Sequence, residues 1–131
     1  ARSHQHGIAF DSSTGWVLPN GARRSPDAAW VARHRIANLD PATLTRYWHL
    51  CPDFIIELRS PTDRIRLLRD KMAESLANGA QLAWLIDPES RTVEIYRPGH
   101  EPRTVTTQTP GPQTLAGEGP VTGFTLDLAP V

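Results

Sequence analysis

The chain has 131 residues, of which 39% are hydrophobic, and this length and composition suit one domain with a core of ordinary size. Its fourteen basic and fourteen acidic residues cancel, so no overall field attracts nucleic acid or an anionic membrane, and any contact with DNA must be local. The single cysteine, Cys51, excludes an internal disulfide framework, and the absence of an apolar run near the roughly 20 residues that span a bilayer predicts a soluble, cytoplasmic protein without membrane contact.

The first third of the chain predicts strands and a short helix. Residues 7–18 hold two short apolar runs around the turn signal SSTG, which indicates a hairpin or two edge strands. A polar loop then leads to a strand at about 27–33, which begins with the dipeptide Pro26-Asp27. Asp40 is a good N-cap before a proline, so residues 39–50 predict a helical turn or short helix.

The block PDFIIEL, residues 52–58, predicts a strand with a carboxylate in it. Because side chains alternate along a strand, residues 54, 56 and 58 would lie on one face, and Asp53, Ile55 and Glu57 on the other. Burial of an unpaired charge costs several kcal/mol or forces the group to become neutral. Glu57 therefore needs a structural or functional reason.

Residues 60–79 predict an amphipathic helix. Ser60 can cap it, Pro61 suits the first turn, Asp63 favours the positive end of the helix dipole, and Gly79 ends the helix. The apolar positions recur at spacings of three and four and form the expected buried stripe: Ile65, Leu68, Met72 and Leu76.

The last third of the chain predicts further strands. LAWLIDP and TVEIYRP are two strands joined by the turn DPESR, a hairpin signal. The stretch 98–123 is rich in Pro, Gly and Thr and predicts loops with one strand at about 103–107, whereas GFTLDLAP alternates like a strand that docks on the core. The order of three strands, a helix and three strands predicts an α/β domain around one mixed sheet over residues 1–131.

Asp27, Glu57 and Lys71 would bring two carboxylates and an ammonium group together from three elements. Neighbouring strands place paired Cα atoms about 5 Å apart, so Asp27 is a suitable companion for Glu57, whereas Asp53 lies roughly 13 Å along the same strand and is expected to cap a turn. Mg²⁺ binds one or two carboxylates and takes its other ligands from water and substrate phosphate. Such an ion activates water and neutralises phosphoryl charge, so Glu57 is a candidate metal ligand.

The spacing of these residues leaves a plainer alternative open. Asp27 and Glu57 can pair with arginines in a structural network, and Lys71 can be a solvated helix residue whose stem covers the apolar stripe. Four arginines near the proposed site suit a DNA backbone, although charged helix faces are common: Arg59, Arg64, Arg66 and Arg69. Cys51 is expected to be a buried thiol and not a nucleophile.

The run from Pro52 to Gly99, with RRSPDAAWV upstream and GEGPVTGFTLDL downstream, closely resembles the Uma-type (Uma2) family of restriction endonuclease-like proteins in the PD-(D/E)XK nuclease superfamily. The resemblance implies a restriction endonuclease-like fold, with a central mixed sheet flanked by helices. It also implies metal-dependent cleavage of DNA phosphodiester bonds with Mg²⁺ or Mn²⁺. The Pro-Asp motif falls on Asp27 and the acidic residue of the (D/E)XK element falls on Glu57, so both would bind the metal.

The sequence departs from the family pattern at two places. Arg59 stands where the motif has its lysine, and because arginine keeps its proton it is a poor base, so the lysine role passes to Lys71 on the following helix. Arg59 and Arg64 remain candidate contacts to substrate phosphate. Family members also carry an N-terminal helix with another acidic residue, so we expect this chain to be truncated at its N-terminus. The apolar sheet face left bare would favour a homo-oligomer.

The leading hypothesis is therefore a Mg²⁺- or Mn²⁺-dependent DNA endonuclease with Asp27, Glu57 and Lys71 as its catalytic residues. The alternative is a noncatalytic nucleic-acid-binding or interaction module on the same fold, with its acids retained for structure. A third hypothesis is a stable fragment that is inert because its first helix is absent.

Overall fold

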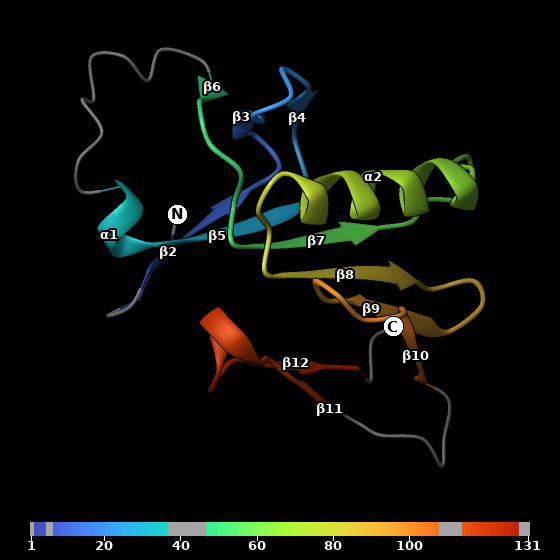
Figure 1. Cartoon of the computed structure of the whole chain (residues 1–131). Coiled ribbons are helices and arrows are strands. Elements are labelled where there is room, and N and C mark those ends of the chain that lie inside the picture. The colour runs from blue at the N-terminus through green and yellow to red at the C-terminus, as the bar shows by residue number, and fades with distance from the viewer. Residues whose placement is uncertain (1, 5–6, 37–46, 108–113, 129–131) are drawn as a thin grey trace.

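The computed structural model of the chain describes residues 2–4, 7–36, 47–107 and 114–128. No helix within these ranges has the length and apolarity needed to span a bilayer. Figure 1 shows the arrangement of the elements, which are in chain order β1 (Arg2–His4), β2 (Gly7–Asp11), β3 (Gly15–Val17), β4 (Arg23–Arg24), β5 (Ala28–Ala32), α1 (Arg33–Ile36), β6 (Tyr47–Trp48), β7 (Phe54–Leu58), α2 (Ile65–Ala77), β8 (Leu82–Asp87), β9 (Thr92–Tyr96), β10 (Arg103–Thr106), β11 (Thr114–Ala116), the 3₁₀-helix η2 (Gly119–Val121) and β12 (Thr125–Asp127).

A mixed sheet of seven of the described strands organises the fold, in the order β1-β2-β5-β7-β8-β9-β10. β7 and β8 run parallel, and the other neighbours in this sheet are antiparallel. A parallel pair needs a long crossover, which α2 supplies between β7 and β8. The predicted mixed α/β sheet and the predicted hairpin of β8 and β9 are therefore confirmed.

β3 leaves the large sheet and pairs with β4 and β6 in a three-stranded sheet of its own. The predicted turn between β2 and β3 exists, because the backbone N–H of Thr14 donates to the carbonyl of Asp11. Both alternatives for residues 7–18 are nevertheless wrong: the two strands belong to different sheets, so they form no hairpin, and each lies between two neighbours, so neither is an edge strand. A local apolar run shows that a strand forms but does not choose its partner.

The helix expected to begin at Asp40 lies outside the described residues, except for its end. There Tyr47 and Trp48 form β6, parallel to β3, and not a helix. Both residues are aromatic, and aromatic side chains favour strands. The short helix α1, directly after β5, was not predicted.

Helix α2 begins at Ile65 and not next to Ser60. The carboxylate of Asp63 accepts hydrogen bonds from the backbone N–H and the hydroxyl of Ser60, at 2.8 and 2.9 Å, so Asp63 closes a turn before the helix. The N-cap position falls on Arg64, which makes no side-chain capping bond. The predicted C-terminal end is confirmed, because Gly79 follows the last turn with a φ of 119°, a conformation that favours glycine.

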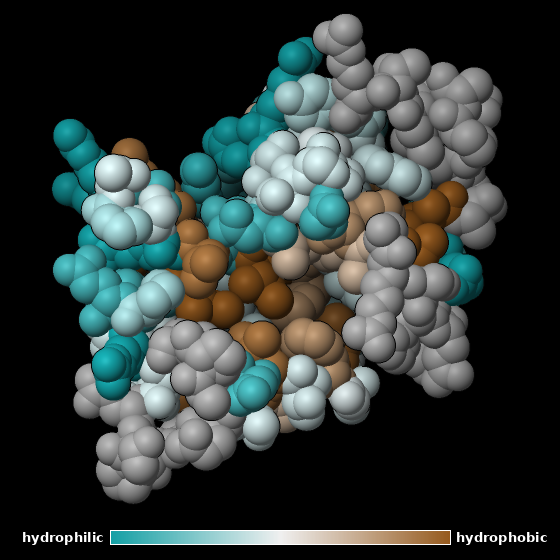
Figure 2. Space-filling view, turned by 180° about the vertical axis from the view of Figure 1, so that it is seen from behind, coloured by the Kyte–Doolittle hydropathy of each residue, from teal (hydrophilic) through white to brown (hydrophobic). Residues whose placement is uncertain are grey.

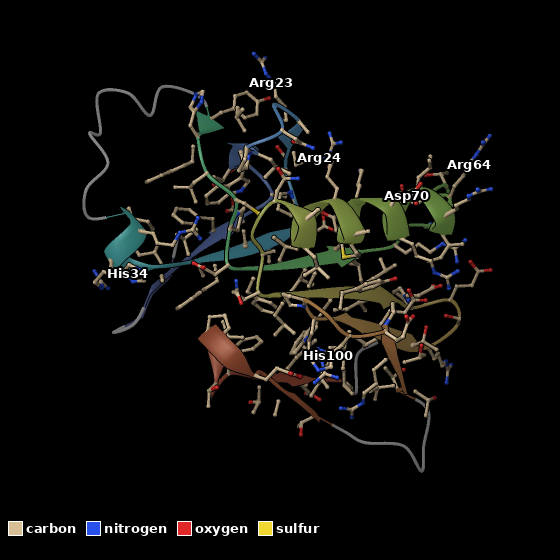
Figure 3. All side chains as sticks on the ribbon, in the orientation of Figure 1. Arg23, Arg24, His34, Arg64, Asp70 and His100 are labelled. Atoms are coloured by element: carbon tan, nitrogen blue, oxygen red, sulfur yellow. The ribbon has the colours of Figure 1, made fainter. Side chains whose placement is uncertain are left out.

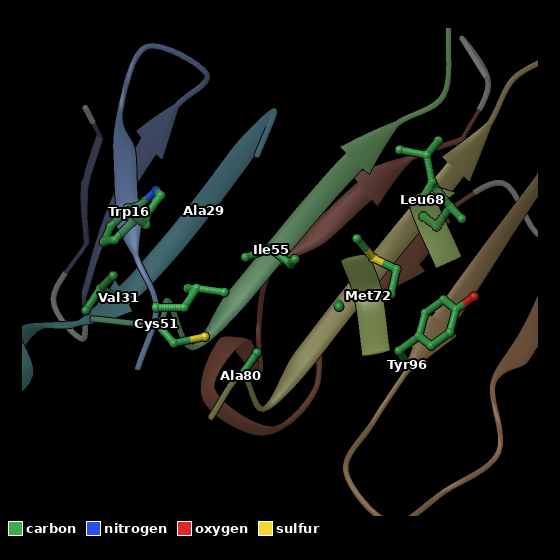
Figure 4. Close-up of a cluster of buried hydrophobic side chains, with 12 residues drawn as sticks. Trp16, Ala29, Val31, Cys51, Ile55, Leu68, Met72, Ala80 and Tyr96 are labelled. Atoms are coloured by element: carbon green, nitrogen blue, oxygen red, sulfur yellow. The ribbon is translucent and has the colours of Figure 1, made fainter. Parts of the chain in front are cut away.

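α2 buries its predicted stripe against one face of the sheet (Figure 4). Leu68 and Met72 are buried, and Ile65 and Leu76 pack beside them. The other face is covered in part by the β11–β12 pair and η2, which bury a second apolar cluster against β8 and β9. In the described residues, the sheet thus has α2 on one face and this small β layer with η2 on the other.

The face of the sheet opposite α2 is only partly covered. Apolar side chains gather in the middle of the face shown in Figure 2. A hollow of about 360 Å³ lies between the sheet and the segment around η2, with Ala28, Trp30 and Ile56 among the strand residues that line it and the half-exposed Phe124 on the other side. Self-association through this partly apolar face remains a prediction.

Met72 of α2 is fully buried and belongs to the apolar cluster between the helix and the sheet. We expect Met72→Ala to lower the free energy of unfolding by about 2–5 kcal/mol through lost burial and the cavity it leaves. Leu67→Ala on the same helix, at a side chain that is 56% exposed, should change it by less than about 0.5 kcal/mol. Urea denaturation of both variants measures the difference, and equal losses would contradict the assigned packing face.

Candidate functional site

The pairing of β5 with β7 places the two predicted acids opposite each other. The antiparallel register pairs Trp30 with Phe54, Ala29 with Ile55 and Ala28 with Ile56. One further step sets Asp27 opposite Glu57, where side chains of cross-strand neighbours lie about 4.5–5.5 Å apart at Cβ. Both residues belong to the face that α2 covers, because Ala29 and Ile55 on that face join the cluster with Met72.

A backbone hydrogen bond orients the carboxylate of Asp27. The N–H of Leu58, the last residue of β7, donates to Oδ2 of Asp27 at 2.6 Å. Asp27 itself is exposed. The bond therefore fixes one oxygen at the end of the β5–β7 pair while the carboxylate stays open to solvent.

Glu57 is half-buried, and its environment favours the neutral form. Burial is the main cause that raises its pKa to about 7, and the nearby charge of Asp27 raises it further. Lys71 and a backbone hydrogen bond from Asp27 act in the opposite direction. The ionised form of Glu57 therefore needs more positive charge nearby than Lys71 provides, and a bound cation would supply it.

Lys71 lies on α2 at the rim of the same site. It is exposed, and it shares with Glu57 a small cavity of about 30 Å³ between α2, β7 and the segment after β4. This space is enough for a water molecule or two. The structure thus brings Asp27, Glu57 and Lys71 to one place, as the sequence predicted, although it does not test their roles.

The donor set fits a hard divalent cation. No group of three or more His, Cys, Asp or Glu side chains able to hold a metal occurs in the described ranges. Two carboxylates are nevertheless sufficient for Mg²⁺, which keeps several waters and takes further oxygen ligands from a bound phosphate. The desolvated Glu57 beside Asp27 is the observation that favours such an ion here.

Asp53 and Cys51 have structural positions. Oδ2 of Asp53 accepts the backbone N–H of Ala32 at 2.8 Å, and Oδ1 pairs with Arg35 at 2.8 Å. Asp53 therefore closes the opposite end of the β5–β7 pair, and its expected role in a turn after Pro52 is not what the structure shows. Cys51 is buried, as predicted, and burial raises the pKa of its thiol to about 11, which disfavours the reactive thiolate.

Of the four arginines predicted near the site, two are paired with carboxylates. Nη1 of Arg59 contacts Asp87 at 2.9 Å, and Nε of Arg59 donates to the carbonyl of Asp63, so a phosphate contact would require Arg59 to leave this pair. Arg69 is likewise held by Glu94. Arg64 is exposed at the N-terminal end of α2 (Figure 3), and it fits the expected phosphate contact better than Arg59.

An ion pair beside the site was not predicted from the sequence. Arg24 lines the cavity of Glu57 and Lys71, and it pairs with Glu74 on α2. The sequence could have indicated both residues by their distance from the predicted site residues. Arg24 stands three residues before Asp27, and Glu74 stands three residues after Lys71 on the same helix.

The raised pKa of Glu57 predicts a pH dependence of stability in metal-free protein. Between about pH 4.5 and 7, the folded state holds a proton that the unfolded state has lost, so stability falls as pH rises. With solvent screening of this half-buried group, we expect Glu57→Gln to be more stable than the parent by about 1–2 kcal/mol at pH 8 and equal at pH 4. Urea denaturation in EDTA measures this, and equal stability at pH 8 would contradict it.

A family profile with the description "Uma2: Putative restriction endonuclease" matches residues 1–129. Among solved structures, the chain is similar to "a putative nuclease belonging to DUF820" from Anabaena variabilis, with a TM-score of 0.79 and 22% sequence identity over 95% of this chain and 66% of that chain. This likeness confirms the nuclease-type fold, and the chain spans 66% of the neighbour's length. The comparison with curated proteins found no match. The resemblance seen in the sequence is thus confirmed: the chain belongs to the Uma2 family, whose description supports a nuclease function in general.

Proposed function

We propose that this chain is the catalytic part of a Mg²⁺- or Mn²⁺-dependent endonuclease that hydrolyses DNA phosphodiester bonds. The observation that carries the proposal is the β5–β7 register, which sets Asp27 against Glu57 on the face where Lys71 enters from α2. Two carboxylates directly opposite each other on neighbouring strands repel and destabilise the sheet unless a cation compensates their charge. A divalent ion supplies that compensation and also suits the family description.

Each residue has a distinct role in this proposal. Asp27, oriented by the N–H of Leu58, and Glu57 hold the metal through carboxylate oxygens. A divalent ion held there would supply positive charge for the phosphoryl group and would lower the pKa of a bound water. Lys71 places its ammonium group against the attacking water or a phosphate oxygen, where positive charge stabilises the transition state. The exposed Arg64 contacts a backbone phosphate of DNA beside the cleaved bond.

Substitution of the three site residues separates metal binding from catalysis. We expect Asp27→Asn and Glu57→Gln each to abolish saturable Mn²⁺ binding in calorimetry and to reduce cleavage of plasmid DNA at least about 100-fold. Lys71→Ala should reduce cleavage on the order of 100-fold and leave Mn²⁺ affinity nearly intact. Asp70→Asn, an exposed acid on the same helix, is the control that should keep both properties.

The outcomes discriminate between the proposed enzyme and a noncatalytic module. DNA binding that ignores both Mn²⁺ and Glu57→Gln, without cleavage, would support a binding module with structural acids. If Lys71→Ala cuts DNA as well as the parent, the assignment of the lysine is wrong even if the metal site is right.

Arg64 and Arg59 should behave differently because Arg59 is paired with the buried carboxylate of Asp87, whereas Arg64 is exposed. Arg64→Ala should weaken DNA binding in EDTA and reduce the slope of log K against log salt by about 1, without loss of stability. Arg59→Ala leaves the buried Asp87 unpaired, so it should cost about 2–3 kcal/mol of stability. Arg103→Ala, an exposed arginine on β10, is the control, and an equal change in its salt slope would refute a specific role for Arg64.

A further inference from the structure

Three charged side chains line the cavity at the proposed metal site: Arg24, Glu57 and Lys71. Glu57 is the one carboxylate among the described residues that line it. Arg24 comes from β4 on one wall, and Lys71 comes from α2 on the other; Figure 3 shows Arg24 beside α2. The side chains of Arg24 and Glu57 therefore border the same small cavity, of about 30 Å³.

The guanidinium of Arg24 is held by contacts that use all three of its nitrogens. Nε donates to Oε1 of Glu74 at 2.7 Å, Nη2 donates to Oε2 of Glu74 at 3.1 Å, and Nη1 donates to the carbonyl of Arg23 at 2.8 Å. The Asn20 amide also donates to Oε2 of Glu74, at 3.3 Å. Glu74 therefore neutralises Arg24 in the two-pronged geometry that arginine prefers.

Loss of Glu74 would leave an arginine with permanent charge beside a cavity that is lined, among the described residues, by the carboxylate of Glu57. Arginine pairs readily with carboxylates, and a guanidinium on Glu57 must be displaced before a cation can use the same oxygens. Lys71 does not block the oxygens of Glu57 in this way, because its flexible amine is a point charge and lacks the planar, two-pronged geometry of a guanidinium.

We propose that Glu74 is a positioning residue of the metal site, which binds Arg24 and so keeps a competing cation off Glu57. The inference rests on the proposed function, because it assumes that Glu57 is a metal ligand. Glu74 itself touches neither metal nor substrate and acts only through Arg24. The ion pair between Arg24 and Glu74, which joins the segment before Asp27 to the helix that carries Lys71, would then serve the metal site.

A set of charge-removing variants tests the proposal by Mn²⁺ titration of the whole chain. Glu74→Gln should weaken Mn²⁺ affinity by about fivefold, the factor that a partly exposed ion pair can supply. Arg24→Gln alone should leave the affinity close to that of the parent. The double variant Arg24→Gln/Glu74→Gln should recover the parent affinity, because the competing cation is gone.

A purely structural role of the pair predicts a different pattern. If Glu74 merely docks β4 on α2, then the double variant binds Mn²⁺ no better than Glu74→Gln, and the proposal is overturned. Glu118→Gln is the matched control, because Glu118 pairs with Arg97 at 3.3 Å with similar exposure and does not line the cavity. It should bind Mn²⁺ like the parent.

A metal-free crystal structure of Glu74→Gln gives a readout that does not depend on metal binding or cleavage. The guanidinium of Arg24 should lie within hydrogen-bond distance of the Glu57 carboxylate. A guanidinium that stays at position 74 or turns to solvent overturns the inference. A parent protein that binds no Mn²⁺ overturns the proposed function instead, so the two failures are distinguishable.

Discussion

The antiparallel register of β5 and β7 is the constraint on which the site depends. A carboxylate closes each end of this pair by accepting a backbone N–H from the partner strand: Asp27 from Leu58, and Asp53 from Ala32. Asp53 is balanced by Arg35, so its end is structural. Asp27 faces Glu57 instead, and a shift of the register by one residue would move Glu57 to the other face of the sheet.

Ion pairs hold several carboxylates on the elements around the site. Glu74 is paired with Arg24, Asp87 with Arg59 and Glu94 with Arg69. Asp27 and Glu57 share Lys71 as their nearby cation, and the pKa of Glu57 is raised in consequence of burial and of Asp27. Perturbed groups of this kind are concentrated at functional sites because catalysis needs charge that is not already neutralised.

Local patterns predicted those elements whose signals are short-range. The apolar stripe of α2, the hairpin of β8 and β9, and the alternation along β7 all follow from the period of side chains in a helix or strand. The start of α2 was misplaced, since Asp63 engages Ser60 in a turn that competes with capping. The partner of β3 was also missed, because strand pairing depends on segments distant in the sequence.

The sequence by itself determined the residue types of the site, the strand and helix that carry Glu57 and Lys71, and the family, because these are encoded in contiguous motifs. Only the tertiary structure decided that Asp27 stands opposite Glu57, that Arg59 is bound to Asp87, and that Glu74 restrains Arg24. Those contacts join residues between 28 and 50 positions apart in the chain. Their geometry arises from sheet register and helix docking, which no local pattern specifies.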